Sequence, residues 1–408
     1  MPQVKVGSII EISYTMKDED YIFQDWVFQN FYPTLKSTFR VITGPLISYQ
    51  FFSQGSYIDE MEKLKSGTVT LFSMENLPPI KSEPFVPSPI DYAPRIMAQI
   101  KANTMKGVYT GDSSMEISWS ELKKSLREIP MTSRYLSKKK SVAKEINPLL
   151  SDISDPLAKM DRIYQYVQKE ITWDGRHSKL AYQPLKEVTK SKQGNSSEIN
   201  QLLIYLLRMN GLDAQAMLVS TRDHGSIFKE FVIRGQFNTL VAFVKIGDQE
   251  FVLDASKKNA SWQYMPEELI YQEGWIMDES EDGVWYSISP KKRITQTIFG
   301  RLKMDERGAF KGDMSHQYNG YYAQKYRDID LEVIQESMAS LYPEGEIYEL
   351  SVERGEDVNS SLKYRYQLET EGYGQQVGST LYLRPFMDLA LQESPVDAEE
   401  RLYPMEFG

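Results

Sequence analysis

The segment that most restricts how this chain can fold lies near its middle, where apolar and aromatic residues follow one another from Leu202 to Leu207. A helix over residues 196–209 would carry such side chains around its whole circumference, so other elements must cover it on all sides. Gly211 provides the glycine that commonly ends a helix. We therefore expect this helix to be the central one of its domain.

The neighbouring segments predict an α+β domain around that helix. Upstream, Asp155 is a good N-cap and Pro156 a good first helical residue, and an apolar stripe follows at helical spacing. Downstream, three strands are expected at residues 216–221, 239–244 and 250–253. The last two flank Gly247-Asp248, a typical two-residue hairpin turn. Helices followed by an antiparallel sheet define the α+β class.

The ends of the chain are predicted to be β-rich and sandwich-like. Strands are expected at 6–14, 27–41, 297–304, 309–315, 347–353, 362–369 and 379–383, with one helix at 321–338. A chain of 408 residues exceeds the size of most single cores. We predict three domains: a β-rich domain over 1–110, helices with the central domain over 111–290, and a β-rich domain over 291–408.

Two segments before the central helix have alternative interpretations. Six prolines fall within residues 78–94, which predicts an extended connector; a ligand for a proline-binding module is the alternative. Helices are expected over 118–129 and 138–149. The run Lys138–Lys140 is interpreted as a solvated helix face, with an anion site as the alternative.

Composition excludes several classes of function. A net charge of −10 argues against a nucleic-acid surface, and the absence of cysteine excludes disulfides and thiolate metal sites. We expect no membrane span, because no apolar stretch is long enough, and no cofactor, because no nucleotide or metal motif is present. The acidic run Asp278–Asp282 could hold calcium, but a solvated turn is favoured. Residues 1–5 do not introduce a signal peptide.

The start of the central helix is the position at which chemistry would be expected. Free N–H groups and the positive end of the helix dipole follow the small-residue loop Gly194–Ser196, and such an environment lowers a thiol pKa. No cysteine is available to use it. Asn195 and Glu198 also fit a capping box, which would make the loop purely structural.

These segments resemble the transglutaminase-like superfamily, which has a papain-like fold. The resemblance rests on the loop before the apolar helix, the continuation Gly211–Ala214 and the strand ending Leu253-Asp254. It implies a Cys-His-Asp triad, whose cysteine position falls at Ser196, its histidine position at Asn238 and its aspartate position at Asp254. Glu198 takes the acidic position of the motif that opens the helix.

Two of the three triad positions are therefore changed. Serine requires an adjacent base to act as a nucleophile, and the amide of Asn238 cannot accept a proton. The expectation is a protein without catalytic activity. The alternative is a hydrolase or peptidase that uses Ser196 with a relocated base such as His224, although a locally bonded loop histidine is favoured there.

A wider resemblance is to bacterial envelope proteins in which such a core lies between two β-rich domains of unknown function. It rests on the segments 2–11, Ser220–Gly225 and Glu400–Phe407. It implies a periplasmic or outer-surface location, a binding or scaffold role toward a peptide, protein or glycan, and further sequence beyond both ends. The binding groove would be the emptied catalytic cleft.

Overall fold

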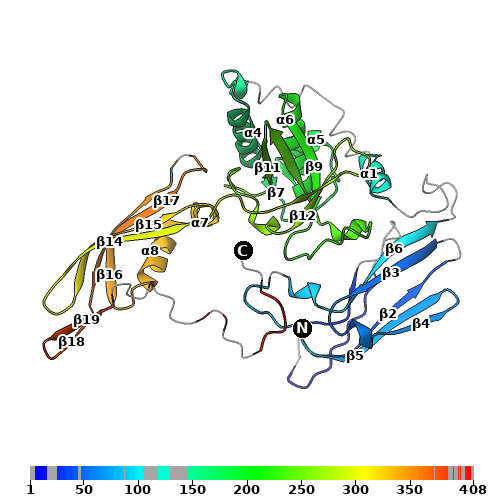
Figure 1. Cartoon of the computed structure of the whole chain (residues 1–408), viewed down its shortest axis with the longest axis horizontal. Coiled ribbons are helices and arrows are strands. Elements are labelled where there is room, and N and C mark those ends of the chain that lie inside the picture. Colours follow the sequence, from blue (N-terminus) through cyan, green and yellow to red (C-terminus); the bar gives the residue numbers. More distant parts are fainter. Residues whose placement is uncertain are drawn as a thin grey trace. The chain divides into compact units, whose positions relative to one another are not determined.

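Helix α6 (Ser196–Met209) belongs to the larger of two units in the computed structural model of this chain (Figure 1). The structure describes residues 5–15, 25–44, 47–86, 88–103, 118–128, 146, 148–355, 357–371, 373–384, 389, 394, 396 and 400–405. One unit is formed by Met1–Ile80 and Tyr92–Glu116, the other by Lys81–Asp91 and Ile117–Gly408. The division into three domains stays a prediction.

The first unit is the β-rich region expected at the start of the chain. Its two antiparallel sheets have the orders β1-β6-β3 and β2-β5-β4. The strands are β1 (Trp26–Val27), β2 (Thr34–Ile42), β3 (Ile47–Gln54), β4 (Glu62–Ser66), β5 (Val69–Leu77) and β6 (Arg95–Asn103). Phe72 and Met74 of β5 and Ile96 of β6 pack in one buried cluster. Side chains of both sheets thus share a core, as in a sandwich.

Two predictions near this unit have different outcomes. The strand expected at residues 6–14 is wrong, because the described residues 5–15 form no strand and leave Ile9 98% exposed. Alternation alone does not make a strand where no neighbouring strand pairs with the backbone. The proline-rich segment is confirmed as a connector, since its described part contains only the short 3₁₀ helix η2 (Pro89–Asp91).

The first helices of the second unit are α1 (Trp119–Glu128), α4 (Pro156–Glu170), α5 (Leu185–Ser191) and α6. Helices α1, α4 and α6 lie where they were expected, whereas α5 was not predicted. The carboxylate of Asp155 accepts the Ala158 N–H at 2.8 Å and caps α4. Met160, Ile163 and Val167 of the predicted stripe are buried. Most of the helix predicted at 138–149, with its lysine run, lies outside the described residues.

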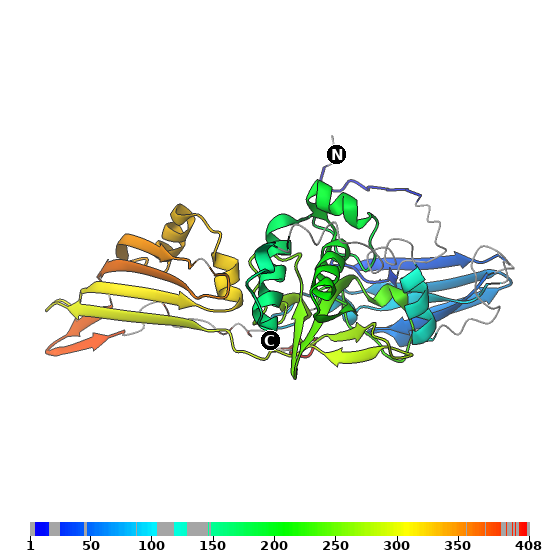
Figure 2. The same cartoon turned by 90° about the horizontal axis from the view of Figure 1, so that it is seen from above.

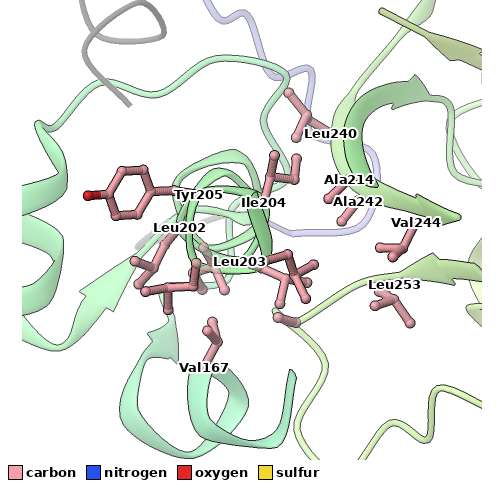
Figure 3. Close-up of a cluster of buried hydrophobic side chains, with 14 of the residues drawn as sticks. Val167, Leu202, Leu203, Ile204, Tyr205, Ala214, Leu240, Ala242, Val244 and Leu253 are labelled. Carbon is pink, nitrogen blue, oxygen red and sulfur yellow. The ribbon is translucent and has the colours of Figure 1, made fainter. Parts of the chain in front are cut away.

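Helix α6 is buried from Ser196 to Leu207, as its uniform apolar character predicts. Figure 3 shows why: Leu202 points toward Val167 of α4, Ile204 points toward the strands, and Tyr205 projects on another side. The antiparallel sheet has the order β11-β10-β9-β12-β13. Its strands are β9 (Asp213–Val219), β10 (Thr239–Ile246), β11 (Gln249–Leu253), β12 (Glu273–Ile276) and β13 (Val284–Ser287). The predicted α+β core is confirmed.

A second antiparallel sheet, of order β14-β15-β17-β16, forms the β-rich C-terminal region. Its strands are β14 (Gln296–Met304), β15 (Phe310–Tyr318), β16 (Gly345–Glu353) and β17 (Leu362–Thr370), followed by the hairpin β18 (Gly374–Val377) and β19 (Thr380–Leu383). Helix α8 (Leu331–Ser340) lies against one face of this sheet (Figure 2). The region is β-rich as predicted, but a helix covers that face where a sandwich would have a second sheet.

The single helix predicted at 321–338 is two helices, α7 (Tyr321–Tyr326) and α8. Between them the Arg327 guanidinium donates to the backbone carbonyls of Gly355 and Ser360. Asp330 occupies the N-cap position of α8, which aspartate favours over a helix interior. The apolar period continued across this break, so periodicity alone did not reveal it. Within the described residues, no helix is both long and apolar enough to cross a bilayer.

Candidate functional site at the start of helix α6

A capping box begins helix α6, as the sequence predicts. The Asn195 side chain accepts the Glu198 N–H at 2.9 Å, and the Glu198 carboxylate accepts the Asn195 N–H at 2.9 Å. Both side chains are buried. N–H groups that would otherwise lack a partner at the start of the helix are thereby satisfied.

Glu198 also fixes a second segment against the helix. One carboxylate oxygen accepts the N–H groups of Tyr182 and Gln183, at 2.9 and 2.8 Å. The other accepts the Gln183 side-chain amide at 3.2 Å. The fully buried Glu198 carboxylate therefore accepts hydrogen bonds both from the start of α6 and from the loop that contains Tyr182 and Gln183. Its role is therefore to hold the loop before α5 against the start of α6.

The Ser196 hydroxyl lies in a closed hydrogen-bonded environment. It accepts the Ser178 N–H at 2.9 Å and the Thr239 hydroxyl at 2.8 Å, and it donates to the Ser178 carbonyl at 3.2 Å. A serine hydroxyl has one hydrogen to donate and two lone pairs to accept with, so these bonds use all of them. The side chain is 0% exposed. The peptide groups of Ser178 thus cover the position at which a nucleophile would stand.

The residue that faces Ser196 from β10 is Thr239, not Asn238 as expected from the sequence. The Asn238 side chain pairs instead with Thr221, whose N–H and hydroxyl lie 2.9 and 2.7 Å from it. Side chains alternate between the two faces of a strand, so an error of one residue exchanges the inward and outward groups. Thr239 is the first residue of β10 and is buried.

Asp254 lies where the resemblance predicts an orienting carboxylate, directly after β11, but it has other partners. One oxygen accepts the Asn200 amide at 2.8 Å, the Ser256 N–H at 3.0 Å and the Ser256 hydroxyl at 2.6 Å. Asn200 also donates to the Leu240 carbonyl and accepts the Ala255 N–H, at 2.9 and 2.8 Å. This buried amide joins α6 to β10 and to the residues after β11.

Asn200 and Ser178 were not predicted as site residues. Asn200 could have been predicted, because it is a polar residue one turn after Ser196 in an otherwise apolar helix. A buried amide requires hydrogen-bond partners, so such a residue marks a polar contact. Ser178 carries no comparable signal, since it acts through its backbone. Its segment is placed by β7 (Thr172–Trp173), which pairs in parallel with β8 (Gln193–Gly194).

His224 lies in the loop after β9 and is bonded locally. Its Nδ1 is 2.9 Å from the Ser220 hydroxyl, whereas the hydrogen-bond partners of Ser196 are Ser178 and Thr239. His177 lies on the segment that covers Ser196, with Nε2 3.6 Å from a Glu268 oxygen. The sequence preference for a locally bonded His224 thus agrees with the observed contact.

A small pocket lies beside Asp254. It has a volume of about 110 Å³ and is lined by Tyr164, Lys257, Tyr264 and Glu268 among others. An ion pair of 2.7 Å between Lys257 and Glu268 lies at this pocket. Ligand pockets usually measure about 300–1,000 Å³, so this one suits water or a very small molecule rather than a chain of sugars or amino acids.

The acidic run that offered calcium as an alternative is docked on α1. Lys123 donates to the carbonyls of Asp278 and Ser280, and Arg127 donates to those of Met277 and Asp278. Arg127 also forms an ion pair of 3.4 Å with the Glu279 carboxylate, so two cationic side chains lie against this run. No group of three histidine, aspartate or glutamate residues with metal-binding geometry occurs in the described part of the chain.

Comparison with known proteins assigns two segments to families. Residues 142–287 match the transglutaminase-like superfamily, and residues 1–81 match DUF3857, a domain of unknown function. No curated protein matches the chain. The predicted transglutaminase-like core and the flanking domain of unknown function are therefore confirmed as segments of this chain.

The solved structures similar to this chain include the following two. One, from Parabacteroides distasonis and provisionally named a protease, has 12% identity over 90% of this chain and 71% of its own, with a TM-score of 0.46. The other, from Cytophaga hutchinsonii and provisionally named a cysteine protease, has 11% identity over 57% of this chain and 74% of its own, with a TM-score of 0.23.

Proposed function

We propose that this chain, whose residues 142–287 form a transglutaminase-like domain, is a non-catalytic protein that acts as a binding or scaffold module. The observation that carries the proposal is the hydrogen bonding of Ser196. Its hydroxyl hydrogen is directed to the Ser178 carbonyl, and both lone pairs are occupied by neutral donors. A serine nucleophile needs that hydrogen on a base and one lone pair free for the substrate.

The other two positions support the same proposal. Thr239 contributes a neutral hydroxyl on the side of Ser196 where a base would have to stand, and a hydroxyl cannot serve as a general base near neutral pH. Asp254 is bonded to Asn200 and Ser256, so its carboxylate stabilises the fold around α6. The three positions thus form a polar core that links helix and strands, with no group that accepts a proton from Ser196.

A reactive-serine probe tests the proposal directly. We expect the full chain to resist labelling by a fluorophosphonate, to hydrolyse no fluorogenic peptide library, and to incorporate no fluorescent amine into a glutamine donor. Ser196→Ala and His224→Ala should leave these readouts at the level of the unmodified chain. Ser197→Ala, one residue along the same buried turn, controls for packing effects.

A contrary result would be equally clear. Labelling at Ser196, or hydrolysis that both Ser196→Ala and His224→Ala abolish while Ser197→Ala retains it, would establish the alternative hydrolase. In that enzyme His224 would have to exchange its Ser220 partner for Ser196.

We also propose that the protein works in the bacterial cell envelope, on a peptide, protein or glycan. This location rests on the resemblance described above. Fractionation of cells that produce the native gene product, with protease added to intact and to permeabilised cells, tests it. Recovery of the protein with the cytoplasmic fraction would overturn the proposed location.

A further inference from the structure

The β-rich C-terminal sheet has one covered face and one face with a hollow. Met314, Tyr364 and Tyr366 point to the covered face and pack with Ile334 and Met338 of α8. Their strand neighbours point the other way, because side chains alternate. On that second face a hollow of about 450 Å³ is lined by residues from all four strands, which is a typical volume for a ligand site.

The strand register explains the shape of the hollow. Ser315 of β15 pairs with Phe299 of β14 on one side and with Arg365 of β17 on the other. The small serine therefore lies between two large side chains that rise from the neighbouring strands. In the next row of the same face, Asp313 lies between Arg301 and Gln367. The other five side chains of these two rows thus stand around a low centre at Ser315.

A bulge in the edge strand β16 adds a further wall. The register between β16 and β17 shifts between Tyr348 and Ser351, and Glu349 within this bulge has a φ of 55°. A non-glycine residue in the left-handed region is uncommon within a strand, and bulges redirect the side chains they contain. Glu349 lines the hollow as a result.

The chemistry of the lining suits a sugar ring. Phe299 is 59% exposed, and an open aromatic ring provides a flat apolar surface on which the C–H face of a pyranose stacks. Around it stand two carboxylates, an amide and two guanidinium groups, whose paired donors or acceptors match neighbouring hydroxyl groups. The Gln367 amide already donates to Asp313 at 2.7 Å, which fixes both groups in position.

The charges indicate that the sugar is acidic. Arg365 pairs with Glu353 at 3.1 Å, but in the described part of the chain Arg301 and Lys363 have no ion-pair partner. Asp313 and Glu349 also line the hollow, so its charges are mixed, and the two cations outside ion pairs are the groups available to an anionic ligand. A guanidinium binds a carboxylate through two parallel hydrogen bonds, which gives both strength and orientation.

We propose that this hollow binds an oligosaccharide that contains a uronic acid, with its ring on Phe299 and its carboxylate on Arg301, two residues along the same strand. The site lies on β14, β15, β16 and β17, whereas Ser196 and its partners lie on α6, β10 and the segment before α5. The proposal therefore does not depend on whether Ser196 is reactive. It gives a ligand class to the binding role proposed above.

Titration calorimetry with a matched pair of sugars tests the site. The acidic probe is a tetrasaccharide of alternating glucuronic acid and N-acetylglucosamine, and the neutral probe is chitotetraose. We expect the full chain to bind the acidic probe more tightly. Phe299→Ala and Arg301→Gln should each weaken its binding by roughly tenfold or more, as expected for the loss of a stacking surface or a charged hydrogen bond. Ser315→Trp should abolish binding by filling the hollow.

Two variants outside the hollow serve as controls. Tyr382→Ala removes another exposed aromatic side chain, which is 60% exposed on β19, and Lys311→Gln removes a cation that is paired with Glu369 at 2.7 Å. Both should bind the acidic probe like the unmodified chain. All substituted side chains except Ser315 are largely exposed, so these variants should keep the thermal unfolding temperature of the unmodified chain. An unchanged temperature would exclude misfolding as the cause of weaker binding.

Three results would overturn the proposal. They are the absence of binding to the acidic tetrasaccharide, binding that Phe299→Ala and Arg301→Gln leave intact, and equal binding of oligoglutamate, which would show a site for carboxylates in general. None of these results bears on the reactivity of Ser196, so failure here and failure of the proposed non-catalytic function are separable.

Discussion

At the scale of single residues, His316 is the buried histidine of the C-terminal sheet. Its Nε2 is 2.8 Å from the Tyr366 hydroxyl, which is in turn 2.7 Å from the Tyr342 hydroxyl. Burial lowers the pKa of His316 from 6.5 to about 4, because the charged imidazolium would lose its hydration. Burial also raises the pKa of Tyr366 well above its usual range. This core is thus built from neutral polar groups.

This histidine predicts a pH dependence of stability. Between pH 4 and 6.5 the unfolded chain binds a proton that folded His316 excludes, so the free energy of unfolding should rise with pH across this window and level off above it. The contribution is about 3 kcal/mol at most. Urea unfolding of the C-terminal region at pH 5 and pH 7 should show a smaller difference for His316→Gln than for the unmodified chain. A full difference retained in His316→Gln would contradict the prediction.

Residue by residue, the sequence predicted the candidate site incompletely, and the reasons are physical. Ser196 and Glu198 were found because a helix start has its own pattern. Thr239 was missed by one position, because the direction of a strand side chain depends on a register that only pairing determines. Ser178 was missed because its contribution comes from peptide groups, which every residue has.

At the scale of elements, the loop after β9 is tied to the proline-rich connector. The Asp91 carboxylate accepts the Ser226 N–H and hydroxyl, each at 2.9 Å. Gly225 has a φ of 116°, and a Cβ there would lie 2.3 Å from an Asp91 oxygen. The connector and the loop that carries His224 therefore approach closely only because residue 225 has no side chain.

We predict that Gly225→Ala separates these two elements. The variant should lose the Asp91–Ser226 bonds and about 1–3 kcal/mol of stability, since both backbone strain and a clash arise. Gly211→Ala is a matched control: its φ is 78°, but no atom lies within 4 Å of the added Cβ. Hydrogen exchange should accelerate over residues 220–226 in Gly225→Ala alone. Equal exchange in both variants would contradict the prediction.

Elements with strong local patterns were predicted best. Helices α4 and α6 and the β10–β11 hairpin follow from capping residues, apolar period and turn residues, all of which act over a few positions. The expected strand at 6–14 failed because pairing is a long-range property. The prediction of a single helix over 321–338 failed because Arg327, between α7 and α8, bonds to carbonyls near residue 355. Local sequence does not encode that contact.

At the scale of the whole molecule, residues distant in the chain meet at Glu83. Its side chain is 8% exposed and forms an ion pair of 3.4 Å with Arg401. It also accepts the Leu402 N–H at 2.7 Å, while Arg401 donates to the Pro84 carbonyl at 2.7 Å. The segment 400–405 is thus attached to the connector that precedes η2.

We predict that Glu83→Gln releases this segment. The neutral amide would leave Arg401 without its charge partner in a largely buried position, which typically costs about 3–5 kcal/mol. Brief trypsin digestion followed by mass spectrometry should show faster cleavage after Arg401. Glu75→Gln, which breaks the exposed pair with Lys36, should leave this cleavage rate unchanged. An unchanged rate in Glu83→Gln would mean that the backbone contacts alone hold the segment.

The Ser178 peptide groups that cover Ser196 have a consequence for the history of such a protein. If catalysis was lost here, one mutation cannot bring it back, because a thiol at 196 would still lie beneath Ser178 and opposite Thr239. Recovery would require simultaneous change in the covering segment, the helix start and the first residue of β10. Under the proposed non-catalytic function, the covered site is therefore a barrier that single substitutions do not cross.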